Sequence, residues 1–475
     1  MMSAGIRLFA WGIMATSRLP VAPAPGPLED YLAEFDPVLV SRAQRAAIRD
    51  YVVGLLRPRE RNKTLTALAD TEPGVGSKHR EEQRLQWFLS ESPWDHQAVN
   101  DRRIELLVAD SRTAPHEDGA LVVDDSGDRK SGHATAFVSR QYLGSRGKVE
   151  EGIVAVTTCW ADEKVYWPVH TIPYRPAPTL PGGRKDPEFR TKGQLASQLV
   201  NQARDAGIRF RALVADADYG PSRGPHLVND LDKDGVPYVV AFGPATEIRQ
   251  EAGPAITPGA AAAAVPFVSA SRPGRWHRII RVMRDRHTET WWAADIACGP
   301  YGPNRARRMV VATTDPKTLP GTSTRYLATN LPRRPRRGPH RPATLAEILR
   351  LYSLRNWIEQ EYKQVKHELG WADFQVRSGE AIQRHWTLVN LAFSFSWRKD
   401  NDKPGAPARH PEPGGAGSEL DTWPQRLRRI RSWLVPFHDL LRIIRSGALV
   451  RVPREINRLT ASLASGHGIN LYLPP

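Results

Sequence analysis

The stretch Leu121-Val-Val-Asp124 begins the part of the sequence that decides the fold. It is a short apolar run typical of a buried strand, and similar runs recur downstream between segments with helical spacing. The strand-type runs after it lie at 152–159, 164–169, 210–215 and 237–242, and the helical patterns lie at 192–206 and 226–231. The resulting order β, β, β, α, β, α, β predicts a mixed α/β fold.

The segments on either side of this region differ from it in character. Residues 28–115 have the apolar spacing of helices, whereas residues 243–342 are mostly of β type and interrupt the α/β alternation. A long helix is predicted over 345–369. The expected units are a disordered leader at 1–27, a helical domain at 28–115, a catalytic-type core at 116–242 and 343–400, a β-rich insertion at 243–342, a linker at 401–418 and a basic helical segment at 419–475.

The chain carries a large positive charge. Its 475 residues contain 67 Lys and Arg against 51 Asp and Glu, which gives a formal net charge of +16 and a pI near 10.0. Such a charge attracts polyanions, although a high-GC genome also produces an Arg-rich composition. The two cysteines, Cys159 and Cys298, are too few for a disulfide framework or a thiolate zinc site, as expected of a cytoplasmic protein. No apolar run reaches the roughly 18 to 20 residues that span a bilayer, so no membrane partner is expected.

Acidic residues follow two of the predicted strands. Asp124 and Asp125 come after Leu121-Val-Val123, and Asp216 comes after Leu213-Val-Ala215. Phosphodiester chemistry with two metal ions needs several carboxylates that converge on Mg²⁺ or Mn²⁺, because hard cations prefer oxygen ligands. Acids after strands also occur at ordinary turns and helix caps. Either position alone fits both interpretations, whereas the two together favour a catalytic site.

A third acidic residue lies in the stretch Tyr352-Ser-Leu-Arg355-Asn-Trp-Ile-Glu359-Gln-Glu-Tyr-Lys-Gln-Val-Lys366. At about 100° per residue, the four numbered side chains would fall within roughly 60° of one another on a continuous helix. An adjacent apolar stripe could then pack on the sheet while these side chains face a ligand. The alternative is a solvated helix face with ion pairs such as Glu359 with Lys363.

The order Tyr-x2-Arg-x3-Glu-x6-Lys in this stretch resembles the signature of a large branch of bacterial insertion-sequence transposases of the DDE superfamily. The region around Asp124, from Val122 to Gly132 with 140–144 and 147–149, looks like the first-aspartate neighbourhood of the same enzymes. The likeness covers roughly residues 30–400. It implies an RNase H-like catalytic core that is interrupted by a β insertion before the glutamate.

The resemblance also implies which acids are catalytic. Asp124, Asp216 and Glu359 would hold two Mg²⁺ or Mn²⁺ ions, with Asp125 as the alternative first acid. The family's Asp-x-Thr-like pattern maps onto the acid at 124, which favours it over its neighbour. At the second position Asp218 stands where the family often has Gly, but Asp216 directly ends the strand.

Further roles follow from the same resemblance. Tyr352, Arg355 and Lys366 would contact transposon-end DNA, and the helical domain at 28–115 would bind DNA as well. The implied partners are the terminal inverted repeats and target DNA, and a homodimer would act on paired ends. The implied location is the bacterial cytoplasm.

Additional DNA contacts are predicted in the β-rich segment and at its end. Relatives in this branch can pass through a hairpinned DNA end, and the candidates for stacking on a flipped base are Trp276, Trp291 and Trp292. Tryptophans in β-rich segments are more often core residues. The candidates for phosphate contact are Arg333, Arg334, Arg336 and Arg337, together with the cations from Arg426 to Arg431.

Two other functions fit parts of the sequence. A transposase-derived regulator would bind DNA without cutting it, and an RNase H-like nuclease would hydrolyse DNA without strand transfer. The intact acids at 124, 216 and 359 argue against the first. The spacing from Tyr352 to Lys366, with the insertion before it, argues against the second.

Overall fold

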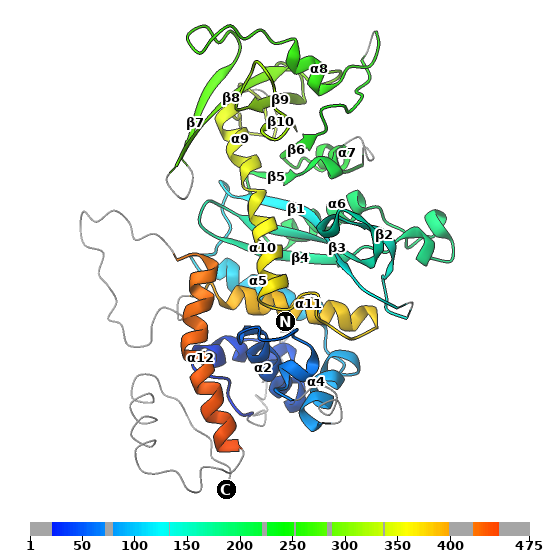
Figure 1. Ribbon diagram of the computed structural model, residues 1–475, viewed down its shortest axis with the longest axis vertical. Coiled ribbons are helices and arrows are strands. Elements are labelled where there is room, and N and C mark those ends of the chain that lie inside the picture. The colour runs from blue at the N-terminus through cyan, green and yellow to red at the C-terminus, as the bar shows by residue number, and fades with distance from the viewer. Residues whose placement is uncertain are drawn as a thin grey trace, which may run out of the picture.

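A computed structural model of the chain describes residues 21–71, 79–132, 134–220, 226–250, 253–282, 287–335, 338–398 and 421–445. Within this part a β-sheet crosses the middle of an elongated molecule, with helices at one end and a mostly β lobe at the other (Figure 1). Most of the expected leader at 1–27 and all of the expected linker at 401–418 lie outside the described residues.

In the described part of the chain, ten strands form one sheet in the order β2-β3-β1-β5-β6-β10-β9-β8-β7, and β4 pairs with β3. The strands are β1 (Ala120–Arg129), β2 (Ser139–Leu143), β3 (Lys148–Ala161), β4 (Tyr166–Pro173), β5 (Ala212–Ala215), β6 (Tyr238–Phe242), β7 (His277–Val282), β8 (Thr288–Ile296), β9 (Arg308–Thr313) and β10 (Thr324–Thr329).

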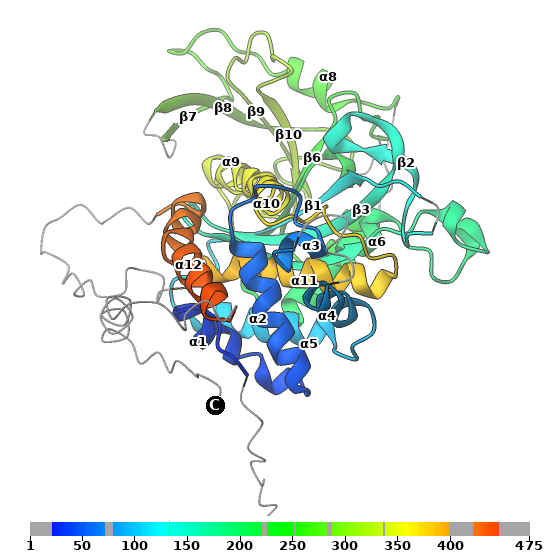
Figure 2. The same cartoon turned by 60° about the horizontal axis from the view of Figure 1, so that its bottom comes forward.

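The centre of the sheet is parallel. β1, β5 and β6 run in one direction, and β3 and β4 add antiparallel strands on the other side of β1. Every residue of β5 and β6 is buried, as expected of parallel strands that are covered on both faces. The arrangement confirms the predicted mixed α/β class with an RNase H-like core (Figure 2).

The first strand is longer than the sequence predicted. We expected it to end before Asp124, but β1 continues to Arg129. The reason is its partner: β3 pairs with β1 along the whole length, from Ala120↔Ala161 to Arg129↔Gly152. The other partner of β1 is β5, which ends earlier. The last β1–β5 pair is Val123↔Ala215. Asp124 therefore lies within β1 but beyond the end of β5.

The β-rich segment at 243–342 extends the central sheet. β10 pairs antiparallel with β6, and β9, β8 and β7 follow outward in turn. The short helix α8 (Pro258–Ala263) lies in the same lobe (Figure 1). The segment expected as an insertion therefore shares hydrogen-bonded strands with the core.

Helices cover both faces of the central strands. α6 (Lys192–Asp205) contacts β3, β4 and α7 (His226–Lys233). α9 (Leu345–Ser353) contacts β5, β6 and β8, and α10 (Asn356–His367) contacts β1, β3 and β4. Side chains of consecutive strand residues point to opposite faces. Asp125 reaches Lys192 of α6 and Asp124 reaches Arg355 beside α10, so these two helices lie on opposite faces.

The N-terminal helices pack around α11 at the lower end of the molecule (Figure 1). They are α1 (Pro27–Ala33), α2 (Arg42–Leu56), α3 (Leu65–Leu68), α4 (Arg80–Ser90) and α5 (His96–Ala109), and they meet α11 (Gly379–Phe395) and α12 (Trp423–Arg445). α12 is fixed by Trp423, whose ring stacks on Phe393 with centroids 4.7 Å apart. No described helix is long and apolar enough to cross a membrane.

Several arginines serve the interior of the fold. Arg308 is 1% exposed, and its guanidinium binds both carboxylate oxygens of Asp295 at 2.9 and 3.2 Å. The same group donates to the carbonyl oxygens of Leu331 and Ala343. It therefore joins β8, β9 and both ends of the loop between β10 and α9.

Arg308→Met should lower the free energy of unfolding by about 3–5 kcal/mol, because buried Asp295 would lose its close bidentate partner and keep only the half-exposed Arg333, whose Nε lies 3.9 Å away. Urea denaturation at neutral pH measures the change. The matched control is the neighbouring Arg307→Met, whose ion pair with Asp232 is 28% and 26% exposed and should cost less than about 1 kcal/mol. Equal losses in the two variants would contradict the prediction.

Candidate active site

Two of the predicted acids meet where the parallel pair β1 and β5 ends. The last pairing of these strands joins Val123 to Ala215, so Asp124 and Asp216 each follow a residue of that pair. The carboxyl ends of parallel strands are the usual place for ligands in an open α/β sheet. The sheet register thus brings together two acids that are far apart in the sequence.

Backbone amides hold both carboxylates in the same way. Oδ1 of Asp124 accepts a hydrogen bond from the Asp125 N–H at 2.8 Å, and Oδ1 of Asp216 accepts one from the Asp218 N–H at 2.9 Å. Asp216 thereby caps the short 3₁₀ turn Ala217–Tyr219. In each carboxylate the second oxygen, Oδ2, faces Arg355.

The helix that carries the third acid is broken beside Arg355. A single helix over 345–369 was expected, and this is wrong: α9 ends at Ser353 and α10 begins at Asn356. Across the junction the amides bond to carbonyls three residues earlier, as in Arg355 N–H to Tyr352 O at 3.1 Å. This tighter turn places Arg355 at the N-cap of α10.

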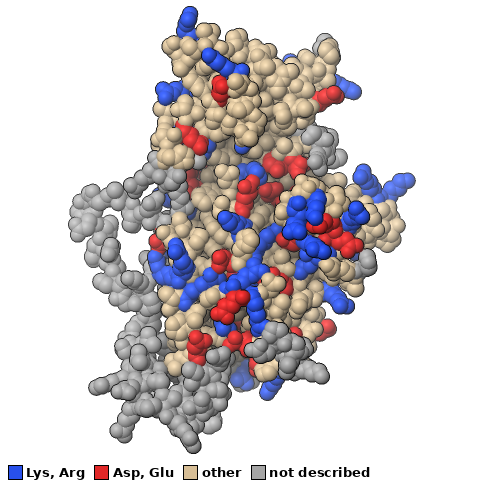
Figure 3. All heavy atoms as spheres, viewed as in Figure 1, with Lys and Arg blue, Asp and Glu red and all other residues tan. Residues whose placement is uncertain are grey.

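One guanidinium contacts all three acids. Nη1 of Arg355 lies 3.0 Å from Oδ2 of Asp124 and 3.9 Å from Oδ2 of Asp216, and Nη2 lies 2.5 Å from Oε1 of Glu359. We call these four residues the carboxylate site. On the face that Figure 3 shows, acidic side chains gather with Lys and Arg around the middle of the molecule, where α10 crosses the strands.

The carboxylate site is short of positive charge despite Arg355. Burial, followed by the charge of Asp216, raises the pKa of Asp124 to about 8, although Arg355 opposes the shift. Burial also raises the pKa of Asp216 against the effect of the same guanidinium. Ionising both carboxylates in this setting is unfavourable unless further cations approach.

Asp125 faces away from the carboxylate site. Its Oδ2 lies 2.7 Å from Nζ of Lys192, and its Oδ1 accepts a hydrogen bond from the Tyr219 hydroxyl at 3.3 Å. Sequence reasoning missed Lys192, although a signal was present. A cation at the first position of a helix is unfavourable because it opposes the helix dipole. A lysine at the start of α6 therefore suggested an acidic partner, which the structure shows to be Asp125.

Lys366 lies against β1, apart from Glu359. Its ammonium donates to the Ser126 hydroxyl at 2.7 Å and forms an ion pair with Asp128 at 2.7 Å, and its side chain is 16% exposed. The hydroxyl of Tyr362 donates to the carbonyl oxygen of Asp124 at 3.1 Å. These contacts fix the register of α10 on the strand that carries the first acid.

The remaining predicted DNA contacts do not converge on the carboxylate site. Trp276, Trp291 and Trp292 are 2%, 8% and 7% exposed, so their rings are packed in the β lobe. Arg333 follows β10, whose end pairs with the start of β6, and it therefore lies with Arg334 at the amino edge of the parallel strands. Arg336 and Arg337 lie outside the described residues.

Tyr352 lies close to the carboxylate site but is largely buried. Burial raises the pKa of its phenol, and the nearby charges of Arg355 and Arg325 oppose this shift. Arg325 belongs to β10. Tyr352 thus lies between Arg355, at the start of α10, and Arg325 of β10.

Comparison with known proteins agrees with this geometry. Residues 34–293 match the family model described as DDE superfamily endonuclease. The chain is 30% identical over 357 residues, covering 75% of this chain and 83% of the relative, to a protein named "Probable transposase for insertion sequence element IS701" from Microchaete diplosiphon.

The chain belongs to the DDE superfamily of endonucleases. It is therefore an enzyme that acts on DNA, as the resemblance predicted. Among solved structures, a piggyBac transposase synaptic complex with hairpin DNA matches with a TM-score of 0.42 and 11% identity, over 92% of this chain and 78% of that chain. We draw nothing from this distant likeness.

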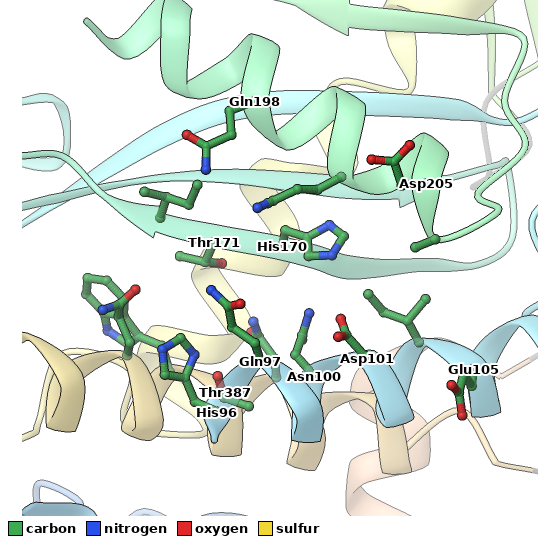
Figure 4. Close-up of a pocket in the computed structure, with 17 residues that line it drawn as sticks. His96, Gln97, Asn100, Asp101, Glu105, His170, Thr171, Gln198, Asp205 and Thr387 are labelled. Carbon is green, nitrogen blue, oxygen red and sulfur yellow. The ribbon is translucent and has the colours of Figure 1, made fainter. Parts of the chain in front are cut away.

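A large cavity of this endonuclease lies elsewhere. About 690 Å³ in volume, it lies between α5, α6, β4 and α11, and Figure 4 shows Asp101, Glu105 and Asp205 among its lining side chains. Lys and Arg are absent from the described residues that line it. A cavity with acidic and amide walls does not suit a phosphate backbone, so the carboxylate site remains the candidate active site.

DDE superfamily endonucleases use divalent metal ions. Among the described residues, no three His, Cys, Asp or Glu side chains are grouped closely enough to bind a metal ion. In the carboxylate site the acids surround the Arg355 guanidinium. Their shared role as metal ligands stays a prediction.

Asp124→Asn should change how stability depends on pH in metal-free buffer. Because the pKa of Asp124 in the folded protein is raised from 3.8 to about 8, its stabilising effect is complete below about pH 4 and is lost as the pH rises through 8. Asn stays neutral, so the Tm of the variant should rise relative to wild type between pH 4 and 8. Parallel curves over that range would contradict the prediction.

Proposed function

We propose that this DDE endonuclease is a DNA transposase that cuts DNA at transposon ends and joins the freed ends to target DNA, using Asp124, Asp216 and Glu359 with divalent metal ions. The observation that supports it is the convergence of these acids, from two strands and one helix, on a single guanidinium. The 30% identity to a probable transposase of an insertion sequence element also supports this function.

The donor set of the carboxylate site suits Mg²⁺ or Mn²⁺. It offers oxygen atoms alone, which hard cations prefer, and burial, followed for Asp124 by the charge of Asp216, raises the pKa of both aspartates despite Arg355. We propose Asp124, Asp216 and Glu359 as the ligands of two ions. When bound, such ions activate the attacking oxygen and stabilise the leaving oxygen of the phosphodiester.

Asp124 is the first acid in this proposal because of strand geometry. Only one face of β1 looks toward Arg355 and Glu359, and Asp124 lies on that face while Asp125 contacts Lys192 and Tyr219. Backbone amides and Tyr362 hold the strand at this point. The site therefore orients its acids before DNA arrives, and such orientation lowers the cost of reaching the transition state.

The Arg355 side chain would occupy one position without DNA and another when DNA is bound. Without DNA it neutralises part of the charge on the three acids. A DNA phosphate offers a guanidinium an equivalent pair of acceptor oxygens. We infer that Arg355 moves from carboxylates to a phosphate when the scissile strand binds, which frees carboxylate oxygens for metal ions at the same moment.

The partners follow from the same proposal. Terminal inverted repeats and target DNA are the substrates, the N-terminal helices contribute to DNA binding, and two chains act on paired ends. Tyr352, beside Arg355, would help to position the transposon end. A regulator that binds but does not cut, and a nuclease that cuts but does not join, are the outcomes that would replace this function.

Glu359→Gln keeps the size of the side chain but removes a charge that a divalent ion needs. Cleavage of a terminal-repeat duplex in Mg²⁺ should fall by at least about 10³-fold, or about 4 kcal/mol, while binding of the duplex persists. Gel-shift titration and end cleavage on the same preparations measure the two quantities. Cleavage at the wild-type rate would remove Glu359 from the active site.

The matched pair Asp124→Asn and Asp125→Asn tests the choice of the first acid. The proposal expects the former to abolish cleavage and the latter to retain it within about tenfold once folding is equal. If wild type binds ends but never cuts them with any divalent ion, the protein is a regulator. If ends are cut and never joined, it is a nuclease.

Arg355→Gln tests the movement of the guanidinium. Without DNA the variant should bind Mn²⁺ about tenfold more tightly, because a competing cation has been removed from the acids. Its DNA affinity should fall and its salt dependence should decrease by about one unit of slope. Calorimetry with Mn²⁺ and anisotropy with DNA measure these effects. The comparator is Lys366→Ala, because the Lys366 ammonium contacts Ser126 and Asp128 of β1 and not the three acids of the carboxylate site.

A further inference from the structure

A basic groove lies at the amino edge of the parallel strands. α6 ends there, and Arg204 and Arg209 form one side while His340 and Arg341 form the other. Phe210, Val236 and Pro237 complete the lining of a hollow of about 310 Å³. We call it the amino-edge groove. It brings together cations from the end of α6 and from the loop before α9.

The loop side of the groove is held firmly at its base. The Ala343 N–H donates to the Pro332 carbonyl at 2.9 Å and closes the loop. Arg211, which is 5% exposed, donates to the carbonyl oxygens of Arg341 and Pro342 and pairs with Glu347 at 2.6 Å. The backbone that carries Arg341 is therefore fixed before any ligand binds.

The cations of the groove are open to solvent. Arg204 and Arg209 are exposed. The side chain of Arg341 is 60% exposed, and its ion pair with Glu117 is long, at 3.9 Å, with that glutamate 67% exposed. Exposed pairs of this kind contribute little, so Glu117 leaves most of the positive field in place. A second hollow, of about 610 Å³, continues on the other side of Pro339 and His340.

The groove and the carboxylate site lie at opposite edges of the sheet. Lys192 at the start of α6 reaches Asp125, so α6 runs from the carboxyl edge to the amino edge on the face away from Arg355. β5, which spans the two edges, has only four residues, or about 13 Å. DNA has a persistence length of about 500 Å. A single duplex that reached both sites would have to turn around the end of the sheet over a length far below this persistence length, which costs bending energy.

We propose that the amino-edge groove binds the phosphate backbone of a second DNA duplex, distinct from the one whose strand reaches the carboxylate site. The three exposed arginines contact phosphates without reading sequence, as cations on a basic surface do. The braced loop lowers the entropy lost on binding. The inference needs only that the enzyme acts on DNA and does not depend on metal ions or on strand transfer.

The test uses the full-length chain with Arg204, Arg209 and Arg341 all changed to Ala, in a Glu359→Gln background with EDTA, so that no cleavage intervenes. The probe is a labelled random-sequence duplex of about 30 base pairs, titrated between about 50 and 200 mM salt. The triple variant should bind one duplex per chain where the parent binds two. The slope of log affinity against log salt for the lost event should be about two to three units.

The control removes the same charge elsewhere, by Arg184→Ala, Lys185→Ala and Lys317→Ala, all at exposed positions outside the N-terminal helices. It should keep both binding events. Arg209→Glu alone is a second variant, in case the triple change disturbs folding, and should weaken the second event by at least about tenfold. Two duplexes bound with an unchanged slope by the triple variant, or an equal loss in the control, would overturn the proposal.

Discussion

The contact of Arg355 with three carboxylates is the constraint on which the rest of the site depends. Acids that approach one another inside a protein repel, and burial adds to the cost of ionising them. Asp124 and Asp216 show this cost in their raised pKa values. The Arg355 guanidinium lowers the cost of ionising these two acids but does not remove it. The fold therefore keeps these acids together in a state that favours the entry of more positive charge.

Strand alternation around β1 determines what each neighbouring residue can do. Asp124, Ser126 and Asp128 face α10, where Arg355 and Lys366 contact them. Asp125 faces the other layer and is tied to α6. The long pairing with β3 continues β1 through this region, whereas β5 ends beside Val123. Adjacent residues of one strand thus have different roles.

The positive charge of the chain is divided between two uses. Arg49, Arg103, Arg308 and Arg384 are buried and bind carboxylates and carbonyl oxygens within the fold. Arg431 of α12, expected to meet phosphates, instead bonds to the carbonyl of Leu56 and to Glu368. The net charge of +16 therefore indicates a polyanion partner without saying which arginines meet it.

The sequence by itself determined the order of strands and helices, because that order depends on local patterns, while its choice of Asp124, Asp216 and Glu359 as the catalytic acids stays a prediction. Helix α6 and strand β6 lie within the stretches 192–206 and 237–242 that the sequence indicated. The sequence favoured Asp124 over Asp125 only through a family pattern, because the direction of a strand side chain is known only once its partners fix the faces.

Tertiary structure decided the rest. The length of β1 and the union of the β-rich segment with the core come from contacts between residues distant in sequence. Long-range contacts also determine the position of Lys366. Helical periodicity predicted that it shares a face with Glu359, but in the structure its ammonium pairs with Asp128 of β1. Helical spacing describes one isolated helix, while long-range pairing determines which face of it meets the sheet and which meets DNA.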